Sequence, residues 1–306
     1  MRKTMKHPVT SPSESVGVNA AGDVVMRYVA VQVQRLLANE ELVRTDQPEA
    51  VHQMRVALRR LRSALASYRP IFDGAVTEPL RAELAWLGGA LGPARDLEVL
   101  RAGLAKQLKA DGHADMLLRA QVDRQLLTRR SAALDEIRWD LDGERFDRLR
   151  TALIDLVNSP PLTGEAARNA SAALPRRVEK SWRQLREAVR GAEETGLDDA
   201  TRALRLHEAR KKAKRARYAA EVARPQCGRP ATRFVKEMKR VQTALGRAQD
   251  GAVSVVELER LAPGVDNAFA LGRAQVLEER RIAAQVGAFG RVWKRASGRR
   301  VRRWLR

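Results

Sequence analysis

The chain has 306 residues, and its 58 lysines and arginines outnumber its 37 aspartates and glutamates, giving a formal charge of +21 and an isoelectric point near 11.2. A surplus of this size is repulsive in a compact protein and is typical of proteins with a polyanionic partner. A hydrophobic content of 44% excludes a chain that is only a disordered basic tail. The single cysteine excludes a disulfide framework and a cysteine-rich zinc site.

Alanine, leucine and valine must form most of the core, because aromatic residues make up only 4% of the chain. Alanine and leucine are strong helix formers, and the β-branched and aromatic residues typical of strands are not dominant. The composition therefore predicts an all-α fold. The N-terminal sequence lacks the apolar segment of a secretory signal, and no stretch is apolar for long enough to span a bilayer. We therefore expect a cytoplasmic location.

The helical period of apolar residues begins near Val18, after a polar leader, residues 1–17, that we expect to be disordered. Proline and glycine then divide the N-terminal half into five predicted helices. These helices are residues 20–39, 48–69 and 76–91, a fourth that follows Gly92-Pro93 and ends near Lys109, and a fifth that follows Asp111-Gly112 and ends near Trp139.

The clearest internal boundary is the segment 158–164, where two prolines and a glycine interrupt the pattern. The sequence thus divides into a first half, 18–157, a second half, 165–287, and a basic C-terminal tail, 288–306. The helices predicted in the second half are residues 165–192, 198–222, 231–244, 248–261 and 265–286.

One sequence block occurs in both halves. Residues 51–62 and 206–217 share the pattern apolar-His-x-x-Arg-x-x-x-basic-basic-x-Arg. A Leu-Gly-x-x-x-Asp block follows each copy, at residues 91–96 and 245–250. The two offsets, 155 and 154 residues, are nearly equal. This agreement indicates an internal duplication, with two similar helical bundles related by a pseudo-twofold axis.

The first copy places its cations on one side of a helix. At about 100° per residue, Arg55, Arg59 and Arg62 fall at roughly 300°, 340° and 280° from His52, beside an apolar face. We call these four residues the first basic ridge. It contains no acid between His52 and Arg69, whereas a helix face that is merely solvated normally mixes both signs of charge.

The second copy repeats this phase, because Arg210, Lys214 and Arg217 share the face of His207 and alanines form the opposite side. This second basic ridge has two glutamates nearby and is less purely basic. At about 1.5 Å per residue each ridge is about 15 Å long, which suits a linear polyanion, and the planar fork of arginine suits phosphate. The candidate binding residues are His52, Arg55, Arg59, Arg60, Arg62, His207, Arg210, Lys211, Lys214, Arg215 and Arg217.

The two histidines occupy equivalent positions beside the ridges. They are either hydrogen-bond donors to phosphate or packing supports for the arginines, and the sequence is compatible with both roles. Asp96 and Asp250, at the ends of the Leu-Gly blocks, are expected to cap a helix or to pair with a ridge arginine.

These blocks resemble the CHAD family, an α-helical domain named for its histidines. The resemblance extends from about Val18 to about Gly287 and includes Tyr218 beside the second ridge. It implies two pseudo-symmetric four-helix bundles that form one unit with a central basic groove. It also implies binding of inorganic polyphosphate and association with bacterial polyphosphate granules, whereas the helical wheel by itself predicts only paired basic ridges.

We expect no catalytic function, cofactor or metal. Some CHAD proteins also carry a triphosphate-tunnel hydrolase domain, marked by Glu-x-Glu-x-Lys on a strand. The nearest sequence here, residues 257–261, has no lysine and lies in a predicted helix. No glycine-rich P-loop precedes a Lys-Ser/Thr pair. The alternative of an enzyme that transfers or hydrolyses phosphate would rest on Asp96 and Asp250 alone, because such an enzyme needs acids that hold metal ions or a base that positions water.

Nonspecific nucleic-acid binding is the other alternative, because the high isoelectric point meets the charge criterion. The sequence has no helix-turn-helix, zinc finger or RNP-type aromatic pattern. The ridges also lack interleaved aromatic residues on which bases could stack. Weak binding through phosphates alone is therefore what we expect for DNA and RNA.

The C-terminal tail is a second basic feature, with eight lysines and arginines between residues 291 and 306 alongside Trp293 and Trp304. Three interpretations are open: a disordered tail that binds anions, an amphipathic anchor on an anionic surface, or a capping helix with solvated arginines.

Overall fold

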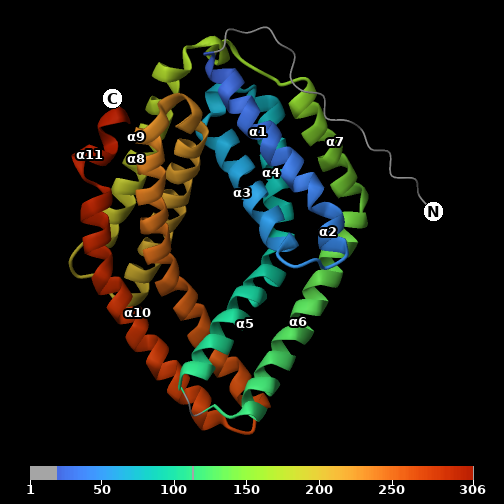
Figure 1. Cartoon of the computed structure of the whole chain (residues 1–306), viewed down its shortest axis with the longest axis vertical. Coiled ribbons are helices and arrows are strands. Elements are labelled where there is room, and N and C mark those ends of the chain that lie inside the picture. The colour runs from blue at the N-terminus through green and yellow to red at the C-terminus, as the bar shows by residue number, and fades with distance from the viewer. Residues whose placement is uncertain (1–18, 112–113, 306) are drawn as a thin grey trace. The chain divides into compact units, whose positions relative to one another are not determined.

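A computed structural model describes residues 19–111 and 114–305 (Figure 1). All regular secondary structure in these ranges is helical, which confirms the predicted all-α class. The predicted disordered leader, residues 1–17, lies outside the described residues. Within them, no helix combines the length and the hydropathy that crossing a membrane requires.

Eleven α-helices and four short 3-10 helices follow one another along the described chain. The α-helices are α1 (Ala21–Ala38), α2 (Glu40–Arg44), α3 (Ala50–Ser67), α4 (Gly74–Ala90), α5 (Gly92–Asp111), α6 (Met116–Asp142), α7 (Glu144–Asn158), α8 (Ala170–Ala192), α9 (Asp199–Leu261), α10 (Ala268–Ala296) and α11 (Arg299–Arg302). The 3-10 helices are η1 (Arg69–Ile71), η2 (Gly164–Ala167), η3 (Ala262–Gly264) and η4 (Arg303–Leu305).

By their internal contacts the helices form two compact units. Unit one contains the chain up to Leu91 together with Ile137–Leu174, and unit two contains Gly92–Glu136 and Pro175–Arg306. The predicted boundary segment, residues 158–164, lies inside unit one, so this division does not follow the halves of the sequence repeat. The arrangement of two equivalent bundles stays a prediction.

In unit one, α3 packs against α1 and α4, and α7 packs against the same two helices (Figure 1). Leu61 of α3, Leu84 of α4 and Leu153 of α7 are fully buried in the core between them. The start of α1 lies close to η2, because a Cβ on Gly22 would be 2.8 Å from the Cβ of Ala166. Only glycine allows this approach.

In unit two, the longest element, α9, consists of two helical arms joined at a kink. Gly228 has φ 57° and ψ −135°, a backbone conformation that favours glycine, and it interrupts the helix between the arms. The arms pack together, since a Cβ on Gly246 of the second arm would lie 3.2 Å from Nη2 of Arg210 in the first. Helix α10 packs along α9, and the ring of Trp182 in α8 stacks on Trp293 of α10 with centroids 5.2 Å apart.

A second apolar cluster in unit two joins α5, α6, the end of α9 and the start of α10. Its members include Leu104, Leu118, Leu258 and Leu271, none more than 1% exposed. Beside this cluster, an ion pair between Arg129 of α6 and Glu257 of α9 ties the same helices together.

Replacing Glu257 with glutamine is expected to lower the free energy of unfolding by about 1–2 kcal/mol at neutral pH. Arg129 donates two hydrogen bonds to this carboxylate, of 2.6 and 3.2 Å, and they hold the pKa of Glu257 below its usual value. Such a group stabilises the fold above its unfolded pKa, near 4.3, and the stabilisation is lost as the pH falls through the folded pKa.

Urea unfolding between about pH 3 and about pH 7 tests this, and the difference between wild type and Glu257→Gln should begin to shrink near the unfolded pKa and continue to fall as the pH drops toward the folded pKa. The matched control is Glu259→Gln, since Glu259 is an exposed glutamate of the same helix. Equal destabilisation by the two variants would contradict the role of the ion pair.

Several predicted helix boundaries differ from the structure. The break expected at residues 245–247 is wrong, because this segment is helical and Gly246 serves a close helix–helix approach instead of a turn. Helix α7 is absent from the prediction, although its apolar residues have helical spacing. Helix α10 continues past the predicted end at residue 286 to Ala296.

Candidate anion-binding site

The first basic ridge lies on α3 in unit one. The apolar face predicted beside it is buried as expected, with Met54, Leu58, Leu61 and Leu65 at most 1% exposed. This burial fixes the rotation of α3 and therefore the direction in which the cations point. Of the predicted residues on this helix, Arg62 is exposed, and the half-buried ones are His52, Arg55, Arg59 and Arg60.

Two arginines of the first ridge have electrostatic features that favour an anion. Burial, together with the nearby charge of Arg81 on α4, lowers the pKa of Arg62. The Nε of Arg59 is buried and has no hydrogen-bond acceptor among the described residues. A buried donor without an acceptor is destabilising, and a phosphate oxygen would satisfy it only after the neighbouring side chains had moved to expose it.

The second basic ridge lies on the first arm of α9 in unit two. Its predicted buried side is confirmed, because Ala209, Ala213, Ala216 and Ala220 are fully buried. The exposed member of the predicted set on this arm is Lys211, and the half-buried members are His207, Arg210, Lys214, Arg215 and Arg217.

The side chain of Arg210 packs against the second arm of α9. Its guanidinium lies over Gly246, where a Cβ would be 3.2 Å from Nη2. Both Nη atoms are 3.4 Å from Oδ1 of Asp250, a half-exposed carboxylate, so this ion pair is long. The Nε of Arg210 is buried and has no acceptor within the described part of the chain. The glycine of the repeated Leu-Gly block thus gives the arginine room while leaving hydrogen-bonding capacity unused.

His207 makes a contact between the two arms of α9, because its Nδ1 lies 3.2 Å from Oε1 of Gln249. The sequence left two roles open for His207, a hydrogen-bond donor to phosphate or a packing support for the arginines. This contact favours the packing role. Asp250 pairs with Arg210, one of the two roles expected for it, but it lies within α9 and does not follow a turn. Asp96 lies near the start of α5, where it is exposed.

Two further cations of the predicted set on this arm pair with glutamates of the same arm. Lys211 pairs with Glu208, and hydrogen bonding to this lysine lowers the pKa of the carboxyl. The Nε of Arg217 lies 3.2 Å from Oε1 of Glu221, and its guanidinium sits 4.4 Å from the ring centroid of Tyr218.

The C-terminal segment is folded, so the disordered-tail interpretation is wrong for residues 288–305. Val301 and Leu305 are buried. Trp304 packs edge-on against Phe234 of α9, with ring centroids 5.9 Å apart. These contacts, and those of Gly246 and Gln249, were not predictable from local sequence, because each of them joins residues far apart in the chain.

A family model described as the CHAD domain matches residues 27–259, which include both ridges. Two proteins of Mycobacterium tuberculosis, the uncharacterised proteins MT2285 of strain CDC 1551 / Oshkosh and Rv2226 of strain ATCC 25618 / H37Rv, are each 34% identical to this chain over 252 residues. The alignment covers 80% of this chain and 47% of each relative. The chain therefore spans about half the length of these curated relatives.

Two solved structures share the fold. PptA from Streptomyces chartreusis superposes with a TM-score of 0.73 at 22% identity, covering 90% of this chain and 99% of that one. The CHAD domain from the plant Ricinus communis superposes with a TM-score of 0.67 at 25% identity, covering 96% of both chains. The family match includes the ridges on α3 and α9 and agrees with these similarities. The chain therefore belongs to the CHAD domain family.

Proposed function

We propose that this chain binds inorganic polyphosphate through its two basic ridges, without chemically altering it. The observation that carries the proposal is that each ridge lies beside a buried apolar face, which fixes the direction in which its cations point. The first ridge has no acid between His52 and Arg69. Such arrays of cations suit an anion supplied from outside the chain.

The chemistry of the ridges suits a phosphate polymer. A guanidinium presents a planar set of donors to phosphate oxygens, and charge-assisted hydrogen bonds are the stronger class. Cations one helical turn apart form a linear array, and each phosphate contact releases condensed counterions. A polymer long enough to contact several cations therefore gains affinity at each one, and a short phosphate does not.

Polyphosphate fits the ridges better than nucleic acid does. Binding of single-stranded nucleic acid commonly uses aromatic faces on which bases stack. The aromatic residue that adjoins the second ridge, Tyr218, is 3% exposed and lies under Arg217, so it offers no such face. The ridges can still contact the phosphates of DNA and RNA. We expect these polymers to bind more weakly than polyphosphate and without sequence specificity.

A non-enzymatic role agrees with the groups on the ridges, which supply cations and hydrogen-bond donors. The carboxylate beside Arg210, that of Asp250, is engaged in the ion pair with this arginine. Within the proposal, the chain holds polyphosphate in the cytoplasm and at polyphosphate granules.

A competition titration at physiological salt tests this proposal. Labelled long-chain polyphosphate is bound to the full chain and challenged with equal phosphate equivalents of unlabelled polyphosphate, DNA, RNA and tripolyphosphate. We expect only the long polyphosphate to displace the label efficiently, because it alone combines high charge density with many contacts. Equal displacement by DNA or RNA would make the ridges a generic polyanion surface. Turnover of the label to shorter chains would contradict the non-enzymatic role.

A further inference from the structure

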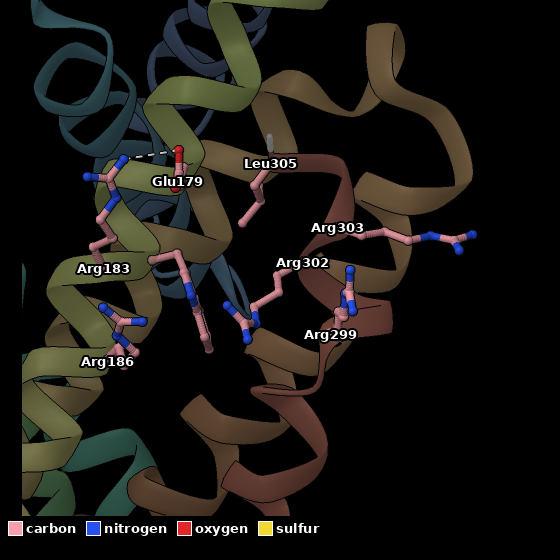
Figure 2. Close-up of a pocket in the computed structure, with 8 residues that line it drawn as sticks. Glu179, Arg183, Arg186, Arg299, Arg302, Arg303 and Leu305 are labelled. Atoms are coloured by element: carbon pink, nitrogen blue, oxygen red, sulfur yellow. Dashed lines mark ion pairs between the residues drawn. The ribbon is translucent and has the colours of Figure 1, made fainter.

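A basic pocket in unit two lies apart from both ridges, between α8 and the C-terminal segment (Figure 2). Its volume is about 480 Å³. Five arginines line it, Arg183 and Arg186 from α8 and Arg299, Arg302 and Arg303 from the C-terminal segment. The C-terminal side of the pocket lies beyond residues 27–259, the part of the chain that the family model matches.

The walls of the pocket are held by packing. Trp182 of α8 lines the pocket and is 2% exposed. Its ring stacks on Trp293 and meets the edge of Phe234, with centroids 5.2 and 6.0 Å apart. On the other side, Val301 and Leu305 are buried and secure the C-terminal segment. The arginines therefore project from two fixed surfaces.

The positive charge of the pocket is largely uncompensated. Glu179 is the one acid among its lining residues, and it pairs with Arg183 at 3.1 Å, leaving a net of four positive charges. Arg186, Arg299 and Arg303 have no carboxylate within ion-pair distance in the part of the chain that the structure describes. Like charges held this close repel one another, and an anion between them would remove the repulsion.

A second observation points to a ligand. The indole Nε1–H of Trp182 is buried and has no hydrogen-bond acceptor among the described residues. Buried donors are nearly always satisfied in folded proteins. Because Trp182 also lines the pocket, a rearrangement of its neighbours on anion binding would give this donor the acceptor that it lacks.

We propose that this pocket is a second anion site, which binds a triphosphate group, either as free inorganic tripolyphosphate or as the ester of a nucleoside. A volume of about 480 Å³ lies in the range of small-molecule sites. The several negative charges of a triphosphate would offset the surplus of positive charge in the pocket. Figure 2 shows Arg302 pointing from the C-terminal segment toward α8, whereas Arg303 points away from it. Arg183, Arg186, Arg299 and Arg302 therefore form the centre of the site.

Isothermal titration of the full chain with sodium tripolyphosphate tests the site, with orthophosphate and magnesium-free ATP as further arms. The test variant is Arg186→Gln/Arg299→Gln, which removes one exposed arginine from each wall. The control variant, Arg190→Gln/Arg300→Gln, removes the same charge from exposed positions on the same two elements that do not line the pocket. We expect the test variant to lose at least about tenfold in affinity and the control to stay within about twofold.

Two further comparisons isolate the site. Repeating the titration in a chain whose ridge residues Arg55, Arg59, Arg210 and Lys214 are alanine should leave tripolyphosphate affinity unchanged. A result that contradicts the pocket proposal can thus be told apart from one that contradicts binding of polyphosphate by the ridges. In the wild type, the indole N–H resonance of Trp182, assigned with Trp182→Phe, should shift on titration and should stay in place in the test variant.

The ATP arm separates the two sources of the triphosphate group. Equal affinity for tripolyphosphate and ATP means that the triphosphate alone is recognised, and tighter binding of ATP means that the nucleoside also contributes. The proposal is overturned if neither ligand binds, if orthophosphate binds as tightly as tripolyphosphate, or if the control variant loses as much affinity as the test variant.

Discussion

Replacing Arg55, Arg59, Arg210 and Lys214 with alanine is expected to weaken the binding of long-chain polyphosphate by about 100-fold at physiological salt. A partly exposed charge pair contributes about 0.7 kcal/mol, so four of them contribute about 2.8 kcal/mol, which is two decades in Kd. The fold should remain, because alanine is a strong helix former and the apolar faces of α3 and α9 are untouched.

The dependence of this binding on salt gives an independent readout. Single-stranded polyanions lose affinity with a slope of about 0.7 in log Kd against log salt for each phosphate contacted. Four lost contacts should therefore make the slope shallower by about 3. If the variant bound polyphosphate less tightly but kept the slope of log Kd against log salt, the number of phosphate contacts would be unchanged. The weaker binding would then come from a change in structure or packing.

The control for the ridge variant removes the same charge from other exposed positions. Arg27 and Arg35 of α1 and Arg280 and Arg291 of α10 are exposed and belong to neither the ridges nor the pocket. Their replacement with alanine should reduce affinity only through the lower net charge, by much less than the ridge variant does. Unchanged affinity in the folded ridge variant, or an equal loss in the control, would refute the ridges as the binding site.

Replacing Phe234 with alanine is expected to lower the free energy of unfolding by about 3–5 kcal/mol. Phe234 lies on the second arm of α9, is fully buried, and meets the edges of Trp182 and Trp304 with centroid distances of 6.0 and 5.9 Å. The substitution leaves a cavity and removes both aromatic contacts, each of which adds about 0.5–1.5 kcal/mol to the area buried. Urea unfolding followed by circular dichroism measures the loss.

The same substitution should also loosen the C-terminal segment, because Trp304 packs against Phe234. Limited trypsin digestion should then cleave after the arginines of residues 299–303 faster than in the wild type. The control is Phe269→Ala, since Phe269 is 76% exposed on α10 and should cost little. Comparable destabilisation by the two variants would show that Phe234 is not the centre of this cluster.

The helices that carry the ridges were predictable because their signals are local. The apolar residues of α3 recur at helical spacing, and this spacing alone places Arg55, Arg59 and Arg62 beside the buried face. The repeated block on α9 is readable for the same reason, with alanine in the buried positions. Local sequence also predicts the ends of α1 to within one residue.

Other features depend on residues that meet only after folding. Glycine in a Leu-Gly block predicts a turn when read locally, yet Gly246 lies within a helix and makes room for Arg210. The prolines near residue 228 predict two separate helices, whereas the conformation of Gly228 alone makes the kink between two arms of one element. At Gly246 the neighbour that decides the outcome is distant in sequence, whereas the kink rests on the backbone conformation of Gly228 itself.

The sequence by itself determined the all-helical class, the positive charge and the faces on which the ridges lie, because composition and the 3.6-residue period act over one or two helical turns. Only the tertiary structure decided which ridge cations meet a carboxylate from another segment, as the ion pair between Arg210 and Asp250 illustrates. It alone also decided that the basic C-terminal segment folds against α9 and closes a pocket with α8. The physical reason is that ion pairing, burial and pocket formation depend on distances between side chains that the chain brings together from far apart.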